Sequence, residues 1–162
     1  MPGDGSGLTE AMTYFKELSI FSYGVQKQWP MQNNVFWLGP GHSFASSTPD
    51  QDVLDLLWKF CSVFVNPTRG LHGCHLCPSQ RLARFSRNGE ERTLGSAEIR
   101  AFSNRGAIFA APNLIYHYVA EHGYKPPEEF IEALSEGTCP PDPEYFSRLQ
   151  KLGHDWCHIQ LP

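Results

Sequence analysis

Proline and glycine recur along this chain at short intervals, and they limit the length of every helix and strand that it can form. The 162 residues include 13 prolines and 14 glycines. Proline fixes φ and removes a backbone donor, and glycine favours turns, so both tend to end regular elements. The chain therefore does not suit a helical bundle, and we expect many short elements joined by turns.

Four segments have the pattern of helices. Three of them begin with proline and end near glycine, which are common boundary residues for helices, and they span residues 112–123, 126–137 and 141–153. An earlier segment, 49–65, has apolar residues at intervals of three and four, with Thr48 as a predicted N-cap. We expect all four to be helical.

The middle of the chain has the pattern of strands. Residues 34–38 form a β-rich run that ends at glycine and proline, and residues 81–112 contain runs of mostly β type. Turn signals at Asn88, Gly89 and 104–106 divide the second region. This spacing predicts an antiparallel meander of about three strands.

One of these strands has a regular alternation of residue types. Ala97 and Ile99 alternate with Glu98 and Arg100. Because successive side chains of a strand point to opposite faces, the alternation predicts that Glu98 and Arg100 lie on a solvated face.

Together these segments predict an α+β fold, in which a small antiparallel sheet packs against several short helices. The length of 162 residues suits one domain. We expect a single globular domain over residues 12–162, preceded by a flexible N-terminal lead-in over residues 1–11.

Charge and hydropathy exclude several partners. The formal net charge is −4, so no basic footprint for nucleic acid or an anionic membrane is expected. The sequence contains no apolar run long enough to span a membrane and no pattern of a secretion signal, so we expect a cytoplasmic protein. Thiols stay reduced there, and the count of five cysteines is odd, so closely spaced cysteines favour a metal site over disulfides.

The stretch "TRGLHGCHLCP", residues 68–78, is the strongest chemical signal. It contains His72, Cys74 and Cys77 in the pattern H-x-C-x-x-C. A C-x-x-C turn can bring two thiolates to one ion, and thiolates with imidazole favour zinc. In an extended backbone His72 would point to the same side as Cys74. A zinc site is the preferred interpretation, and structural thiols without metal or a redox pair are the alternatives.

A fourth ligand must come from elsewhere in the chain, or be water. His117, inside the predicted helix 112–123, is the preferred candidate, and His42 is the next. His122 lies at the end of the same helix, where the helix dipole alone stabilises a histidine. A cluster near the C-terminus is expected to be solvated, although Cys157 stays a candidate ligand: His154, Cys157 and His158.

Several longer stretches resemble a family of small uncharacterised bacterial proteins, found mostly in actinomycetes. The matching stretches cover most of residues 12–134, and they are "MTYFKELSIFSYG", "NVFWLGPGHSF", "NPTRGLHGCHLCP", "LGSAEIRAF" and "IFAAPNLIYHYVAEHGYKPPEEFIEAL". The resemblance implies a cytoplasmic bacterial protein of one domain that shares the H-x-C-x-x-C turn. It implies no activity.

Two functions fit these features. The first is an interaction module for a protein partner, in which His72, Cys74, Cys77 and His117 form a closed structural zinc site. The second is a zinc-dependent hydrolase or lyase with an open metal position, in which Glu98 is the general base and Arg69 or Arg100 holds an anion. The sequence favours the first, because it has surplus ligands and no other catalytic signature. It leaves open whether the chain is an enzyme.

Overall fold

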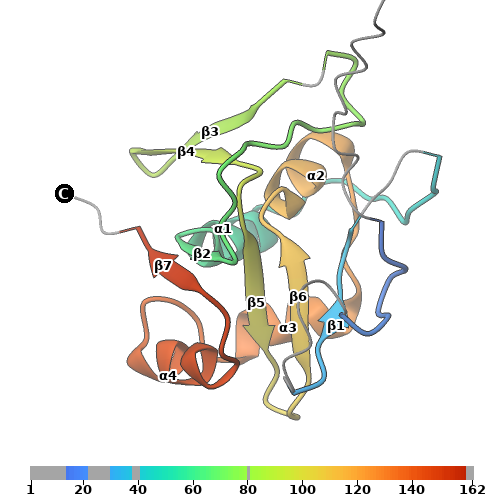
Figure 1. Cartoon of the computed structure of the whole chain (residues 1–162). Coiled ribbons are helices and arrows are strands. Elements are labelled where there is room, and N and C mark those ends of the chain that lie inside the picture. Colours follow the sequence, from blue (N-terminus) through green and yellow to red (C-terminus); the bar gives the residue numbers. More distant parts are fainter. Residues whose placement is uncertain (1–13, 22–29, 38–40, 80, 160–162) are drawn as a thin grey trace, which may run out of the picture.

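The computed structural model describes residues 14–21, 30–37, 41–79 and 81–159, and the predicted lead-in over residues 1–11 lies outside them. The described residues form an α+β domain, as the sequence predicts, and it contains a five-stranded sheet, a separate two-stranded sheet and four helices (Figure 1). The helices are α1 (Gln51–Phe60), α2 (Ile115–His122), α3 (Glu128–Glu136) and α4 (Pro143–Lys151). The strands are β1 (Asn33–Asn34), β2 (Val63–Val65), β3 (Ala83–Arg87), β4 (Glu90–Leu94), β5 (Glu98–Phe102), β6 (Ile108–Pro112) and β7 (Trp156–His158).

The larger sheet has the strand order β1-β6-β5-β2-β7. Its centre is the antiparallel pair β5 and β6, and β2 and β7 extend it antiparallel on one side. On the other side β1 pairs parallel to β6, so the sheet is not purely antiparallel. The strands at the two edges therefore come from opposite ends of the chain (Figure 1).

The predicted meander over residues 81–112 is wrong in its connectivity, although its turns are correct. Asn88 and Gly89 both have positive φ, 52° and 79°, and they close the hairpin of β3 and β4. That hairpin is a separate two-stranded sheet. Gly95, at φ 113°, lies between β4 and β5. After this glycine the chain does not pair with β4 again, and β5 joins the larger sheet between β2 and β6.

The helix predicted over residues 49–65 is shorter than expected. Its N-cap is Asp50 and not Thr48, because the Asp50 carboxylate accepts the backbone N–H of Asp52 at 2.8 Å. The helix ends at Phe60, and the residues 63–65 form β2. Two valines flank Phe64 in that strand, so pairing with β5 and β7 outweighs the continued helical pattern.

The three predicted C-terminal helices are confirmed with slightly narrower bounds. Gly123 ends α2 in the left-handed conformation, at φ 65°. Asp142 caps α4 by accepting the backbone N–H of Glu144, and Pro143 occupies the first turn. No helix among the described residues is long and apolar enough to cross a membrane.

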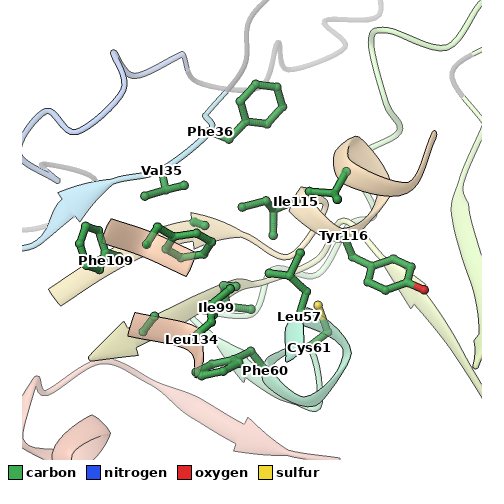
Figure 2. Close-up of a cluster of buried hydrophobic side chains, with 14 of the residues drawn as sticks. Val35, Phe36, Leu57, Phe60, Cys61, Ile99, Phe109, Ile115, Tyr116 and Leu134 are labelled. Atoms are coloured by element: carbon green, nitrogen blue, oxygen red, sulfur yellow. The ribbon is translucent and has the colours of Figure 1, made fainter. Parts of the chain in front are cut away.

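The apolar core lies between the larger sheet and the helices α1 and α3 (Figure 2). Leu57 and Phe60 of α1 point toward Ile99 of β5, and Leu134 of α3 lies against the same group (Figure 2). All four side chains are essentially inaccessible to solvent. Burial of such side chains is the main stabilising contribution to a domain of this size.

The predicted solvated face of β5 is instead a second buried region. Arg100 is 0% exposed and Glu98 is 6% exposed, and they form an ion pair at 2.8 Å. Arg100 also donates to the side chain of Gln32 at 2.6 Å, and the Phe21 ring lies 4.6 Å from its guanidinium carbon. Residues from the N-terminal part of the chain cover this face. The alternation in β5 therefore distinguishes an apolar face from a polar face, and both faces are buried.

His154 belongs to the same region. It is buried, and a ring nitrogen lies 3.1 Å from the Gln32 amide nitrogen. Asn66 joins the group by donating to Glu98 at 3.1 Å. The expectation that the C-terminal cluster is solvated is therefore wrong for His154, which fixes the C-terminal segment to the sheet. We name these residues the arginine network: Gln32, Asn66, Glu98, Arg100 and His154.

Candidate metal centre

The loop between β2 and β3 carries the C-x-x-C turn and passes beside the end of α2 (Figure 1). Two backbone hydrogen bonds fix its start: Thr68 N–H to Ser96 C=O at 2.7 Å, and His72 N–H to Gly95 C=O at 2.9 Å. Gly95 N–H in turn donates to the side-chain oxygen of Asn113 at 2.8 Å. The loop is thereby attached to the turn that precedes β5 and to the segment that precedes α2.

Four side chains converge where this loop meets α2: Cys74, Cys77, His117 and His122. One potential ligand atom from each lies within 4.8 Å of all the others. We name these four residues the metal group. Cys74 and Cys77 come from the loop, and the two histidines come from α2. Cys74 and His117 are buried, and the other two are half-buried.

The distances within this group fit a tetrahedral ion. The two Nε2 atoms are 3.2 Å apart, Cys77 Sγ lies 3.3 Å from His117 Nε2 and 3.4 Å from His122 Nε2, and Cys74 Sγ lies 3.3 Å from His122 Nε2. Zinc bonds of about 2.3 Å to sulfur and about 2.0 Å to nitrogen imply edges of about 3.3–3.8 Å between ligands. Four of the six edges are therefore close to those that a zinc ion requires, and the other two do not exceed 4.8 Å.

Burial shifts the pKa of a histidine and of a cysteine in this group in opposite directions. Burial, with a smaller effect from His122, lowers the pKa of His117 to about 4, so its imidazole is neutral at pH 7 and can donate a lone pair. Burial is also the largest cause that raises the pKa of the Cys74 thiol to about 11. A divalent cation would reverse that preference, because a coordinated thiol loses its proton.

The group differs from the predicted ligand set in one member. Cys74, Cys77 and His117 are brought together as the sequence suggests, but His122 is the fourth member and His72 is not among the four. The prediction for His72 assumed an extended backbone, and residues 71–74 form no strand. What His72 contributes is its main chain, which bonds to Gly95 and holds the loop.

The other predicted ligands lie elsewhere. His42 is exposed and stacks on Tyr14, with ring centroids 3.6 Å apart. Cys157 is exposed on β7, and His158 packs against Phe146 with a centroid distance of 5.0 Å. Among the described residues, these three side chains belong to no group that could hold a metal.

The residues proposed for a catalytic role do not gather at this group either. Glu98 and Arg100 pair with each other inside the arginine network, and Asn66 also bonds to Glu98. Arg69 is exposed. The hydrogen bonds of Glu98 and Arg100 are therefore used in holding the sheet to its neighbours.

The close approach at Gly95 gives a testable prediction for the loop. A Cβ at this position would overlap the carbonyl oxygen of His72, and φ is in the left-handed region. We expect Gly95→Ala to displace the loop, to cost about 1–3 kcal/mol in stability, and to weaken metal binding about tenfold or more while every ligand stays in place. Competition with a chromogenic zinc chelator measures the affinity.

Gly70→Ala is the matched control for this prediction. Gly70 lies in the same loop, and a Cβ there would meet nothing within 4 Å. It should bind metal as the unaltered chain does. Equal affinities for the two variants would show that the contact between residues 72 and 95 does not position the ligands.

The fold and the site together define a small α+β domain with a group of two cysteines and two histidines that could hold a metal ion. Over residues 13–135 the chain matches the family described as Domain of unknown function (DUF7919). That match covers more than half of the chain, and the chain belongs to this family. All four members of the group lie inside the matched region. Comparison with curated proteins and with solved structures finds no match.

Proposed function

We propose that this chain is a zinc-binding domain whose metal is structural, and that the domain acts by binding a partner and not by catalysis. The observation that carries the proposal is the set of four donors from two elements within 4.8 Å of one another. Four protein ligands fill a tetrahedral zinc sphere and leave no position for water or substrate. A hydrolase or lyase at this site would need such a position.

The types of donor support zinc among the common metals. Two thiolates and two imidazoles are soft and borderline ligands, which magnesium and calcium disfavour. An ion held by Cys74 and Cys77 on one side and by His117 and His122 on the other joins the loop to α2. Metal binding of this kind contributes directly to the free energy of folding.

The remaining parts of the proposal concern place and partner. We propose a cytoplasmic location, because reduced thiols in that compartment suit zinc coordination. Bacterial origin is proposed from the resemblance over residues 12–134. The formal net charge of −4 supports a protein or small-molecule partner over nucleic acid or an anionic membrane.

Measurement of the metal content tests the proposal and shows whether His122 or His72 is a zinc ligand. Native mass spectrometry of the purified chain should find one zinc. We expect His122→Ala to weaken zinc binding at least about tenfold, because it removes a donor, and His72→Ala to keep full occupancy. The matched pair differs only in which histidine is removed. Loss of zinc in His72→Ala with retention in His122→Ala would overturn this ligand assignment.

Cobalt substitution tests whether the site is closed. A four-coordinate cobalt site gives intense visible absorption bands that shift when an added anion binds. With four protein ligands, azide should leave the spectrum of the cobalt-loaded chain unchanged. A shift of these bands would reveal an open coordination position and would favour the hydrolase or lyase.

A further inference from the structure

A cavity of about 460 Å³ lies on the part of the domain built by the N-terminal segment, the residues after β1, the loop at 43–45 and the connection between α2 and α3. Its volume is in the range of about 300–1,000 Å³ that small-molecule sites occupy. None of the four residues of the metal group lines it. It is therefore a second feature of the domain, separate from the metal centre.

Aromatic rings form much of the wall. Phe15, Phe36, Trp37 and Phe44 all line the cavity. Phe15 meets Trp37 edge to face at a centroid distance of 5.4 Å, and Phe36 meets Phe44 in the same way at 5.4 Å. Packing of this kind holds the rings in place before any ligand arrives. The faces of aromatic rings carry partial negative charge, which attracts cations.

A carboxylate is fixed in the same wall. Glu17 lines the cavity, and its two oxygens accept hydrogen bonds from the Phe36 N–H at 2.9 Å and from the Tyr124 hydroxyl at 2.6 Å. Its side chain is nevertheless exposed, and no ion pair neutralises it among the described residues. Each oxygen keeps a second lone pair for a ligand.

The charges of the lining have a net negative sign. Among the described residues of the lining, Glu17 and Glu128 are acidic and Lys125 is basic. A ligand with an anionic group would meet two carboxylates, whereas a ligand with an ammonium group would meet both a carboxylate and aromatic faces. These two attractions act together most strongly where water is partly excluded.

From this combination we infer that the cavity binds a small organic ammonium ion with an apolar body. The ammonium group bonds to Glu17, and the apolar body lies against the rings of Phe15, Trp37 and Phe44. The inference rests on the proposed function only in that it gives the binding domain a ligand. It makes no use of the zinc, so the two proposals fail independently.

The test compares two probes of the same shape. Isothermal titration of the zinc-loaded full chain with phenethylammonium should show saturable binding, and 2-phenylethanol, which replaces the ammonium by a hydroxyl, should bind at least about tenfold more weakly. Equal binding of both probes would reduce the cavity to an apolar surface and overturn the inference. Absence of binding by either, or preference for phenylacetate, would overturn it as well.

Three variants locate the charge that is responsible. Glu17→Gln should weaken phenethylammonium binding about tenfold, and Lys125→Gln should strengthen it about twofold to fivefold, because it removes a repelling cation. Glu129→Gln, an exposed acid of α3 outside the lining, is the matched control and should change nothing. If Glu17→Gln unfolds, Lys125→Gln still decides. Unchanged binding in both variants, stronger binding by Glu17→Gln, or weaker binding by Lys125→Gln would contradict the inference.

The outcomes also separate this inference from the zinc proposal. Binding of phenethylammonium by a chain that holds no zinc would overturn only the metal site. A zinc-loaded chain that binds neither probe would overturn only the ligand. Stronger binding of N-acetyl-lysinamide than of phenethylammonium would assign the cavity to a protein side chain and overturn the small-molecule ligand.

Discussion

Replacement of Cys74 by serine is expected to remove zinc from the chain and to lower its free energy of unfolding by about 3 kcal/mol or more. Cys74 is 0% exposed, so its sulfur is enclosed by the loop and by α2. Serine is a poor zinc ligand and leaves a hydroxyl in a buried place. With the ion lost, the remaining three donors no longer hold the loop against the helix. Urea denaturation followed by circular dichroism measures the change.

Chelation provides the complementary measurement. The unaltered chain in excess EDTA should unfold near the midpoint of Cys74→Ser, since both lack the ion, and the variant should not respond to EDTA. Cys157→Ser is the matched control, because Cys157 is exposed and outside the metal group. An unchanged midpoint in Cys74→Ser would rule out a structural metal at this site.

Replacement of Arg100 by methionine is expected to destabilise the chain by about 3–5 kcal/mol, without any effect on zinc content. Arg100 is fully buried and pairs with Glu98 at 2.8 Å. Methionine fills much of the volume but leaves the Glu98 carboxylate buried with the Asn66 amide and without a cation. The Gln32 side-chain oxygen also loses the hydrogen bond that Arg100 donates to it. The variant should therefore lower the urea midpoint and leave one zinc bound per chain.

Two further variants show whether the loss comes from the unpaired carboxylate. Glu98→Gln added to Arg100→Met should recover about half of the loss, because it removes the buried charge. Arg84→Met breaks the pair with Glu91, whose side chains are 63% and 65% exposed, and should cost less than about 1 kcal/mol. Equal costs for Arg84→Met and Arg100→Met would contradict a special role for the arginine network.

Local signals in the sequence were sufficient to predict the elements that begin or end at proline, glycine or an Asn-Gly turn. Proline and glycine mark α2, α3 and α4 within a few residues, and Asn88-Gly89 marks the hairpin. They were insufficient where pairing between distant segments decides. The residues 63–65 continue an apolar helical stripe, yet β5 and β7 pair with them, and nothing near residue 63 announces those partners.

The metal group also combines residues that a local pattern predicts with a residue that only the tertiary structure reveals. Cys74 and Cys77 follow from a local pattern, and His117 follows from the need for a ligand on a neighbouring helix. His122 was set aside because the helix dipole stabilises a histidine at the C-terminal end of a helix without any ligand role. Its spacing of five from His117 also differs from the intervals of three and four at which side chains on one helix face recur. Only the tertiary placement of the loop shows that both rings meet the sulfurs.

The arginine network shows that alternation of polar and apolar residues in a strand does not by itself predict which face is exposed to solvent. Glu98 and Arg100 alternate with Ala97 and Ile99 as in a strand with one wet face. The second face is covered by Phe21 and Gln32, which are far away in the sequence. A polar residue on a strand therefore indicates a change of environment, and the environment itself depends on segments that the local pattern does not include.

The position of β7 has a consequence for association between chains. The shared region ends at residue 135, and β7 pairs with the outer edge of β2 through Val63, Phe64 and Val65 (Figure 1). In this chain, therefore, a strand outside the shared region closes that edge. Unpaired edges are templates for association with other strands. By occupying this edge, β7 shields the backbone donors and acceptors of β2 from pairing with a strand of a second chain.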